Sequence, residues 1–170
     1  MKTILGIDPG LKYTGFGVIC IKNNCINYID HGIISTDAAH EKGSRLANIH
    51  KSIIELITKY KPEEAGIEDI FFAKNIKSAI PVAEAKGVIL CALSLMHINP
   101  STYTPLEVKR GVVGNGRAEK EQVQELVRII LKLKAVPQPD HAAEALAVAL
   151  CHAHSSQMKK FINPRGNEGV

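Results

Sequence analysis

Residues 3–10 read Thr3-Ile4-Leu5-Gly6-Ile7-Asp8-Pro9-Gly10, a short apolar run that ends in an acid and a turn. The apolar residues predict a buried strand, and Pro9-Gly10 predicts the turn that follows it. A carboxylate at the end of such a strand is costly to bury alone, so we expect a cation near Asp8. Residues 14–21 are again β-rich, which predicts an antiparallel partner for the first strand.

The rest of the chain switches between strand and helix patterns. Asn23-Asn24 is a hairpin signal before a third strand at 26–35, and apolar residues at helical spacing predict a helix over 46–60 that Pro62 ends. The further elements expected are a strand at 65–69, a helix at 78–96, a strand at 101–104, and helices at 105–113, 123–133 and from 140 onward. This order predicts an α/β fold, with a five-stranded mixed sheet whose first three strands are antiparallel and with helices on both faces.

Two residues of the expected helix at 78–96 carry predictions of their own. Pro81 is tolerable only in the first turn of a helix, and Gly87 indicates close packing at its position. The apolar character of this helix makes it a candidate dimer interface, although burial against the sheet explains its residues equally well.

Length and composition fit one domain. The 170 residues predict a single domain at 1–155 and a flexible tail at 156–170. A net charge of +4 permits a polyanionic partner without requiring one. The sequence has neither a signal peptide nor an apolar run of about 20 residues, so we expect a soluble, cytoplasmic protein with no membrane association.

The cysteines contain no CxxC pair and lie in apolar stretches, which favours reduced, packed thiols. They are Cys20, Cys25, Cys91 and Cys151. Cys151 with His152 and His154 suggests a metal cluster only weakly, because no second pair completes a zinc site.

Four side chains at the ends of separate elements form the candidate active site: Asp8, Glu68, His141 and Glu144. Each has a simpler alternative. Asp8 could close a turn onto the amides of Gly10 or Leu11, Glu68 could face water, and His141 and Glu144 could be a solvated pair on one helix. Asp140, directly after Pro139, is expected to cap the last helix, with a role as a catalytic ligand as the alternative.

Taken together, these donors favour divalent-metal chemistry. Carboxylate oxygens suit Mg²⁺ or Mn²⁺ and leave positions for water and a phosphate group. Two such ions about 4 Å apart can activate water and stabilise the leaving oxygen of a phosphodiester. Metal-assisted phosphodiester hydrolysis is therefore the predicted reaction.

Several linked motifs support this reading. They are Gly6-Ile7-Asp8-Pro9-Gly10 with Thr14-Gly15, Ile67-Glu68 followed by Phe71-Phe72-Ala73-Lys74-Asn75, Gly111-Val112-Val113-Gly114-Asn115-Gly116 with Ala118-Glu119-Lys120, and Ala142-Ala143-Glu144-Ala145-Leu146-Ala147. In order and spacing they resemble the RuvC family of bacterial crossover junction endodeoxyribonucleases over residues 2–155.

This resemblance implies a ribonuclease H-like fold and a homodimer that cuts four-way Holliday junctions symmetrically with Mg²⁺, in DNA recombination and repair. It also implies that Asp8, Glu68, His141 and Glu144 are the catalytic and metal-binding residues. The commonest family pattern has aspartates at the last two places. Glu144 adds a methylene, and His141 lowers the negative charge and favours softer ions such as Mn²⁺.

DNA contacts are expected from one aromatic residue and from polar and basic residues near the site. The resemblance assigns Phe71 to unpaired bases near the crossover, whereas Phe72 is expected to pack in the core. The remaining candidates are Lys74, Asn75, Lys109, Arg110, Arg117 and Lys120, of which Lys109 and Lys120 match basic positions of the family. The alternative for each basic residue is an ordinary solvated charge.

A homodimer supplies the two active sites that symmetric cutting requires. The RuvA-RuvB branch-migration complex is a further expected partner, by resemblance alone. Two rival functions are a phosphotransferase or ATPase of the actin kind, which the short chain disfavours, and a junction-binding protein of the same fold with impaired catalysis, because His141 and Glu144 replace the usual acids.

Overall fold

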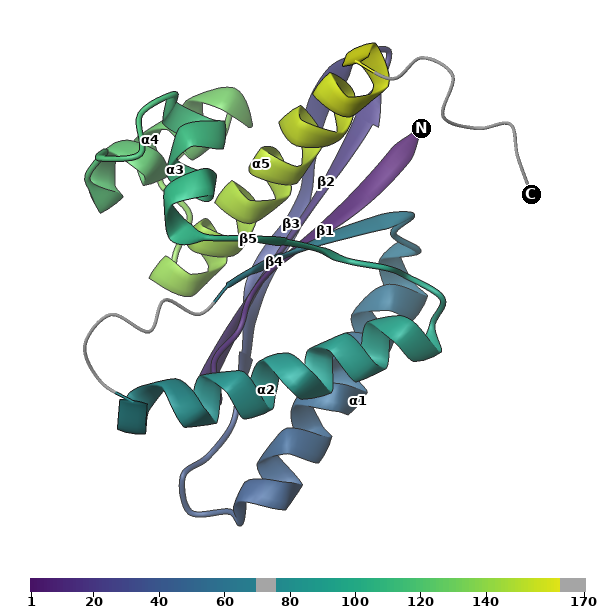
Figure 1. Cartoon of the computed structure of the whole chain (residues 1–170), viewed down its shortest axis with the longest axis vertical. Coiled ribbons are helices and arrows are strands. Elements are labelled where there is room, and N and C mark those ends of the chain that lie inside the picture. The colour runs from purple at the N-terminus through teal and green to yellow at the C-terminus, as the bar shows by residue number, and fades with distance from the viewer. Residues whose placement is uncertain (70–75, 163–170) are drawn as a thin grey trace.

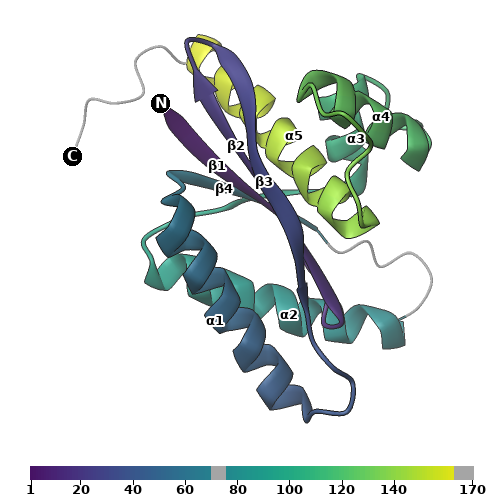
Figure 2. The same cartoon turned by 180° about the vertical axis from the view of Figure 1, so that it is seen from behind.

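Within residues 1–69 and 76–162, which the computed structural model describes, a five-stranded mixed sheet is covered by helices on both faces (Figures 1 and 2). The strands are β1 (Lys2–Asp8), β2 (Tyr13–Lys22), β3 (Cys25–Ser35), β4 (Glu64–Glu68) and β5 (Ser101–Tyr103). The helices are α1 (Lys42–Tyr60), α2 (Ile76–Leu95), α3 (Pro105–Val113), α4 (Lys120–Ile130) and α5 (Asp140–Ile162). The predicted α/β fold class is confirmed.

The strand order in the sheet is β3-β2-β1-β4-β5. The first three strands form the expected antiparallel meander, and β4 and β5 add to it in parallel. Asn23 and Asn24 join β2 to β3 with φ angles of 51° and 60°. Asparagine tolerates this left-handed conformation, which two-residue hairpin turns require.

Alternation along β1 divides its side chains between two apolar clusters. Leu5 and Ile7 pack with the buried residues of α1 and α2, whereas Ile4 packs with those of α3, α4 and α5. Gly6 also faces α5, because a Cβ atom there would lie 2.6 Å from the backbone nitrogen of Ala149. Asp8 follows in the same alternation, so its side chain lies on the α5 face of the sheet.

Two predictions for α2 are wrong. The helix begins at Ile76, so Pro81 lies inside it and beyond the first turn, where its ring leaves a helical carbonyl without an N–H partner. Gly87 has open space where a Cβ atom would stand, so it does not mark close packing within this chain.

Two of the four thiols also differ from expectation. All four cysteines are free, but only Cys20 and Cys151 are buried, while Cys25 and Cys91 are exposed. Residues 156–162, expected in a flexible tail, continue α5 as helix, and 163–170 lie outside the described residues. No helix in the described part of the chain has the length and apolar content needed to cross a bilayer.

Candidate metal centre

The parallel pairing of β1 with β4 brings two of the candidate acids to the same edge of the sheet. Ile7 is paired with Ile67, and Asp8 and Glu68 are the next residues of their strands. Gly66 faces Val148 and His152 of α5, so Glu68, two residues further on, faces α5 as well. Both acids therefore point to the same side of the sheet, as the strand ends predicted.

The first turn of α5 supplies the other two candidates. This helix lies directly on the sheet, because a Cβ atom at Gly15 would meet the carbonyl oxygen of His141. His141 and Glu144 are three residues apart and share one face of the helix. Close approach at a glycine thus places both side chains beside Asp8.

Three of the four side chains, Asp8, His141 and Glu144, come within ligand distance of one another. The Nδ1 atom of His141 donates to Asp8 Oδ2 at 2.6 Å and lies 3.5 Å from Glu144 Oε2. Asp8, His141 and Glu144 each offer a ligand atom, and these atoms all lie within 4.8 Å of one another. Glu68 is not part of this group, but burial raises the pKa of its carboxyl, and it lies near enough for the charge of Asp8 to raise that pKa further.

The simpler alternatives for single residues do not hold. The Gly10 amide donates to Thr14 Oγ1 at 3.4 Å, so the turn after β1 is closed by a threonine and not by Asp8. Glu68 is partly buried against Asp8 and does not face open water. His141 and Glu144 contact Asp8 as well as each other, so they are more than a solvated pair on one helix.

Burial and the closeness of neighbouring carboxylates raise the pKa values of Glu68 and Glu144. Burial raises the pKa of the Glu68 carboxyl to about 8, and the charges of Asp8 and Glu144 add to that rise. Burial also raises the pKa of Glu144, against the opposite effect of a hydrogen bond from Lys120. The hydrogen bond to Asp8 raises the pKa of His141. The cluster therefore holds protons that a bound cation would displace.

The donor set fits a divalent metal ion. The carboxylates of Asp8 and Glu144 and the imidazole of His141 supply oxygen ligands and one nitrogen ligand, with the Glu68 carboxyl close by, a combination that suits Mg²⁺ and Mn²⁺. The raised pKa of Glu68 shows uncompensated negative charge in a partly buried place, which a cation would neutralise. The residues present can therefore hold a metal, as the sequence predicted.

Lys120 and Asp140 take positions that the sequence did not predict. Asp140 is the first residue of α5 and not the residue before it, so the expected N-cap role is wrong. Its carboxylate accepts from Lys120 Nζ at 2.9 Å and from Gln124 at 3.1 Å. Lys120 Nζ also lies 2.8 Å from Glu144 Oε1. These contacts join α4 to α5 across the site. They could not be predicted from the spacing of residues along the sequence.

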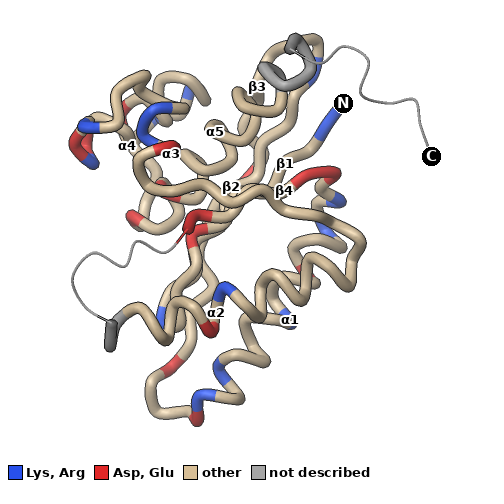
Figure 3. The backbone as a smooth tube through the Cα atoms, viewed as in Figure 1, with Lys and Arg blue, Asp and Glu red and all other residues tan. Residues whose placement is uncertain are grey.

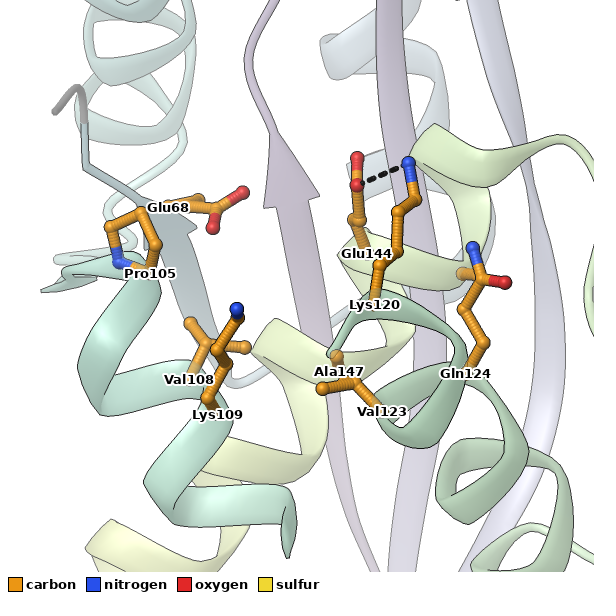
Figure 4. A pocket seen from close by; sticks show the side chains of 10 residues that line it. Glu68, Pro105, Val108, Lys109, Lys120, Val123, Gln124, Glu144 and Ala147 are labelled. Atoms are coloured by element: carbon orange, nitrogen blue, oxygen red, sulfur yellow. Dashed lines mark ion pairs between the residues drawn. The ribbon is translucent and has the colours of Figure 1, made fainter. Parts of the chain in front are cut away.

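A cavity opens beside the cluster between α3, α4 and α5 (Figure 4). Figure 4 shows Glu68 on one side of it and Glu144 with Lys120 on the other, while Lys109 extends from α3 on the side of Glu68. Pro105, Val108, Val123, Gln124, Ala143 and Ala147 complete its lining. Apolar walls beside lysines and carboxylates give the site a face where part of a nucleotide could lie.

Of the other predicted DNA contacts, two arginines are exposed and three residues lie outside the part of the chain that the structure describes. Arg110 is exposed on α3, and Arg117 is exposed in the segment before α4. Phe71, Lys74 and Asn75, together with Phe72, lie outside the described residues. In Figure 3, acidic positions gather in the middle of the molecule, and basic positions lie on α3.

The weakly suggested cluster at 151–154 is not a metal site. Cys151 Sγ donates to the carbonyl of Glu107, and His154 bonds to the carbonyl of Gly111 at 2.8 Å. His152 lies between Tyr103 and Glu64. The three side chains point to different partners.

A mixed sheet with acids ending adjacent strands, and further ligands on the first turn of a C-terminal helix, defines a nuclease of the ribonuclease H-like class. The family model described as "Crossover junction endodeoxyribonuclease RuvC" matches residues 4–152. The chain belongs to the RuvC family, so the resemblance found in its motifs is confirmed.

Two relatives are similar over most of the chain. The RuvC crossover junction endodeoxyribonuclease of Clostridioides difficile is 46% identical over 167 residues, covering 98% of this chain and 99% of that protein. That of Treponema denticola is 50% identical over 147 residues, covering 86% of this chain and 83% of the relative.

Solved structures agree on the fold. Thermus thermophilus RuvC superposes with a TM-score of 0.86 at 32% identity, covering 92% of this chain and 96% of the other. The same protein in complex with a Holliday junction substrate gives a TM-score of 0.84 at 31% identity, with coverage of 93% and 96%. The ribonuclease H-like fold predicted from the sequence is confirmed.

Proposed function

We propose that the protein is a structure-specific DNA endonuclease that resolves Holliday junctions by paired, symmetric, divalent-metal-dependent hydrolysis of phosphodiester bonds. The observation that carries the proposal is the group of Asp8, His141 and Glu144, with Glu68 at the end of the neighbouring strand. This group lies beside a cavity that Lys109 and Lys120 line. Membership of the RuvC family supports the choice of substrate.

The four clustered residues are the proposed catalytic and metal-binding residues, with Mg²⁺ as the natural ion and two ions per site. Bound ions of this kind activate water and stabilise the leaving oxygen. Asp8 and Glu68 hold the sheet side of the site, and His141 and Glu144 hold the helix side. Because His141 must be neutral to bind a metal, its raised pKa predicts that metal binding improves as the pH rises.

The imidazole also bears on the choice of ion. A nitrogen ligand in place of a carboxylate lowers the negative charge and suits Mn²⁺ better than Mg²⁺. We therefore propose that Mn²⁺ substitutes for Mg²⁺ efficiently. Despite its extra methylene, Glu144 presents a ligand atom within 4.8 Å of those of Asp8 and His141, which supports retained catalysis.

Substrate binding is assigned to the basic residues beside the cavity. Lys109 and Lys120 line the cavity next to the acids, so a phosphate group at the metal site would lie between their ammonium groups. Arg110 and Arg117 are exposed on the same part of the chain and extend this surface. Phe71, Lys74 and Asn75 stay predictions from the sequence.

A homodimer is proposed because one chain supplies one set of ligands and symmetric cutting needs two. Along α2, Ile80, Leu90 and Leu95 are exposed, and Gly87 leaves room for close approach of a second chain. We expect Leu95→Glu to give a monomer in light-scattering chromatography, whereas Ile129→Glu on α4 leaves the dimer intact. A Leu95→Glu variant that stays dimeric removes α2 from the interface.

Two further parts of the proposal rest on family membership. We expect the protein to work with the RuvA-RuvB branch-migration complex. Because chromosomal junctions are the proposed substrate, we also expect it in the cytoplasm.

The deciding experiment compares a synthetic mobile four-way junction with a linear duplex of the same sequence, in Mg²⁺, Mn²⁺ or chelator. Paired, symmetric nicks on the junction alone, lost in chelator, are the expected result. Tight junction binding without nicks in either metal would contradict catalysis and favour the alternative, a junction-binding protein of the same fold with impaired catalysis. His141→Asp with Glu144→Asp would then test whether the usual acids restore cutting.

A further inference from the structure

Lys120 joins one proposed metal ligand to one acid outside the metal cluster. Its ammonium group lies 2.8 Å from Glu144 Oε1 and 2.9 Å from Asp140 Oδ2, and Figure 4 shows it reaching Glu144 from α4. Glu144 belongs to the group that can hold a metal, whereas Asp140 does not. The ammonium group of Lys120 thus contacts both a proposed metal ligand and an acid outside the proposed site.

We propose that Lys120 is a tethered cation that competes with a divalent metal ion for Glu144, and that Asp140 holds the ammonium when the metal takes Glu144. This inference rests on the proposed metal site. It assigns Asp140, which is not among the proposed metal ligands, a positioning role in metal loading.

The geometry makes this exchange a local one. Lys120 is the first residue of α4, whose start is fixed by reciprocal hydrogen bonds between Glu119 and Gln122. Its ammonium is already within bonding distance of Asp140, so leaving Glu144 requires only side-chain rotation. Gln124 donates to Asp140 at 3.1 Å and holds that carboxylate in place.

Charge supplies the driving force. The four metal-site side chains carry more negative charge than their partly buried position tolerates, and the ammonium of Lys120 offsets part of it. A divalent ion offsets more, because it carries twice the charge and several carboxylates can bind it together. After the exchange, Lys120 keeps one ion pair and faces the cavity where a phosphate group would lie.

The test is calorimetric titration of Mn²⁺ into the DNA-free protein, which reads metal binding without activity. We expect Lys120→Met to bind Mn²⁺ about tenfold more tightly at the site it frees. Lys51→Met is the matched control, because Lys51 forms an exposed ion pair with Glu55 on α1, on the opposite face of the sheet, and should change nothing. The gain in Mn²⁺ affinity must persist in 1 M salt. Charges more than about 3 Å apart are screened there, so a gain that persists comes from direct contact and not from the general charge of the surface.

A double-mutant cycle tests the role of Asp140. Asp140→Asn should weaken Mn²⁺ binding about threefold in the wild type, because Lys120 then has only Glu144 as a partner. In the Lys120→Met background the same change should have almost no effect. An equal loss in both backgrounds would mean that Asp140 acts as a simple nearby charge, which overturns its positioning role.

Asp8→Asn separates this inference from the proposed function. If Asp8→Asn binds Mn²⁺ as the wild type does, the proposed metal site itself is wrong. If Asp8→Asn loses binding while Lys120→Met binds Mn²⁺ no more tightly than the wild type, the metal site stands and the tethered cation is overturned. Thermal unfolding of each variant confirms that it is folded before titration, and Lys120→Gln serves as a second variant.

Discussion

Replacing the Glu68 carboxyl by an amide of the same shape should stabilise the protein when divalent metal is removed. Glu68 is partly buried and lies close to the charges of Asp8 and Glu144. Its pKa is raised from 4.5 to about 8, so the folded protein holds a proton that the unfolded chain releases at lower pH. Glu68→Gln removes this conflict and keeps a group that can donate to Asp8.

The magnitude follows from the pKa. From 4.5 to about 8 is about 3.5 pKa units, and at about 1.4 kcal/mol each this gives an upper value of about 5 kcal/mol. The neighbouring carboxyls titrate together, so a proton that leaves Glu68 can move to Glu144 instead of being lost from the folded protein. We therefore expect a stabilisation of about half of the upper value. At about 2–4 °C per kcal/mol, the melting temperature should rise by about 5–10 °C.

The sign depends on pH. The folded protein binds more protons than the unfolded chain between the two pKa values, so wild-type stability falls as the pH rises through that window. The advantage of Glu68→Gln should therefore be small below about pH 4.5, grow between there and pH 8, and level off above it.

The assay is thermal unfolding in chelator across this pH range, followed by addition of Mn²⁺. The metal should raise the wild-type melting temperature more than that of the variant, because the variant has lost a ligand. Glu55→Gln, at an exposed glutamate on α1, is the control and should show no such pH dependence. A Glu68→Gln variant no more stable than wild type near pH 9, or one with a constant difference at every pH, would refute the reasoning.

Three further predictions concern the same site. Asp8→Asn should abolish cutting and keep junction binding, because it removes a proposed metal ligand and no basic residue. Nicking and gel-shift assays compare the two, and parallel loss of both would contradict this separation. Lys109→Ala should weaken junction binding and reduce the slope of log K against log salt by about 0.9, and an unchanged slope would remove Lys109 from the phosphate contacts. Gly15→Ala should cost about 3 kcal/mol and weaken Mn²⁺ binding, because the new methyl group would meet the His141 carbonyl and push the first turn of α5 off the sheet; unchanged denaturant unfolding and metal titration would show that α5 can shift freely.

Local sequence patterns predicted the fold and most of the site because strand ends fix both. Apolar runs ending in Asp8 and Glu68, in strands that pair in parallel, bring the two acids to one edge without knowledge of any other contact. Helical spacing predicted that His141 and Glu144 share a face. What it could not predict is how closely α5 approaches the sheet, which depends on glycines in strands far away in the sequence.

The errors have the same origin. Gly87 suggested close packing of α2, but within one chain there is open space at its position. The spacing of apolar residues along α2 does not say which face of the helix another element covers. Cys25 and Cys91 lie in apolar stretches and are nevertheless exposed, because they stand on outward positions of a strand and a helix. Asp140 follows a proline and looked like a cap, yet its carboxylate is drawn to Lys120, 20 positions earlier, by the packing of α4 on α5.

Glu144 shows why the difference from the commonest family pattern matters physically. Its two oxygens serve different partners: Oε1 lies 2.8 Å from Lys120 Nζ, and Oε2 lies 3.5 Å from His141 Nδ1. An aspartate has one methylene fewer, so it could not span the same two contacts unless α4 or α5 moved. The longer side chain of Glu144 therefore lets Lys120 form an ion pair with the proposed metal site. His141 lowers the negative charge with which that site would attract a metal. His141 and Glu144, at places where the commonest family pattern has aspartates, therefore both shift metal preference in the same direction. They disfavour weakly bound Mg²⁺ and favour an ion such as Mn²⁺ that binds nitrogen as well as oxygen.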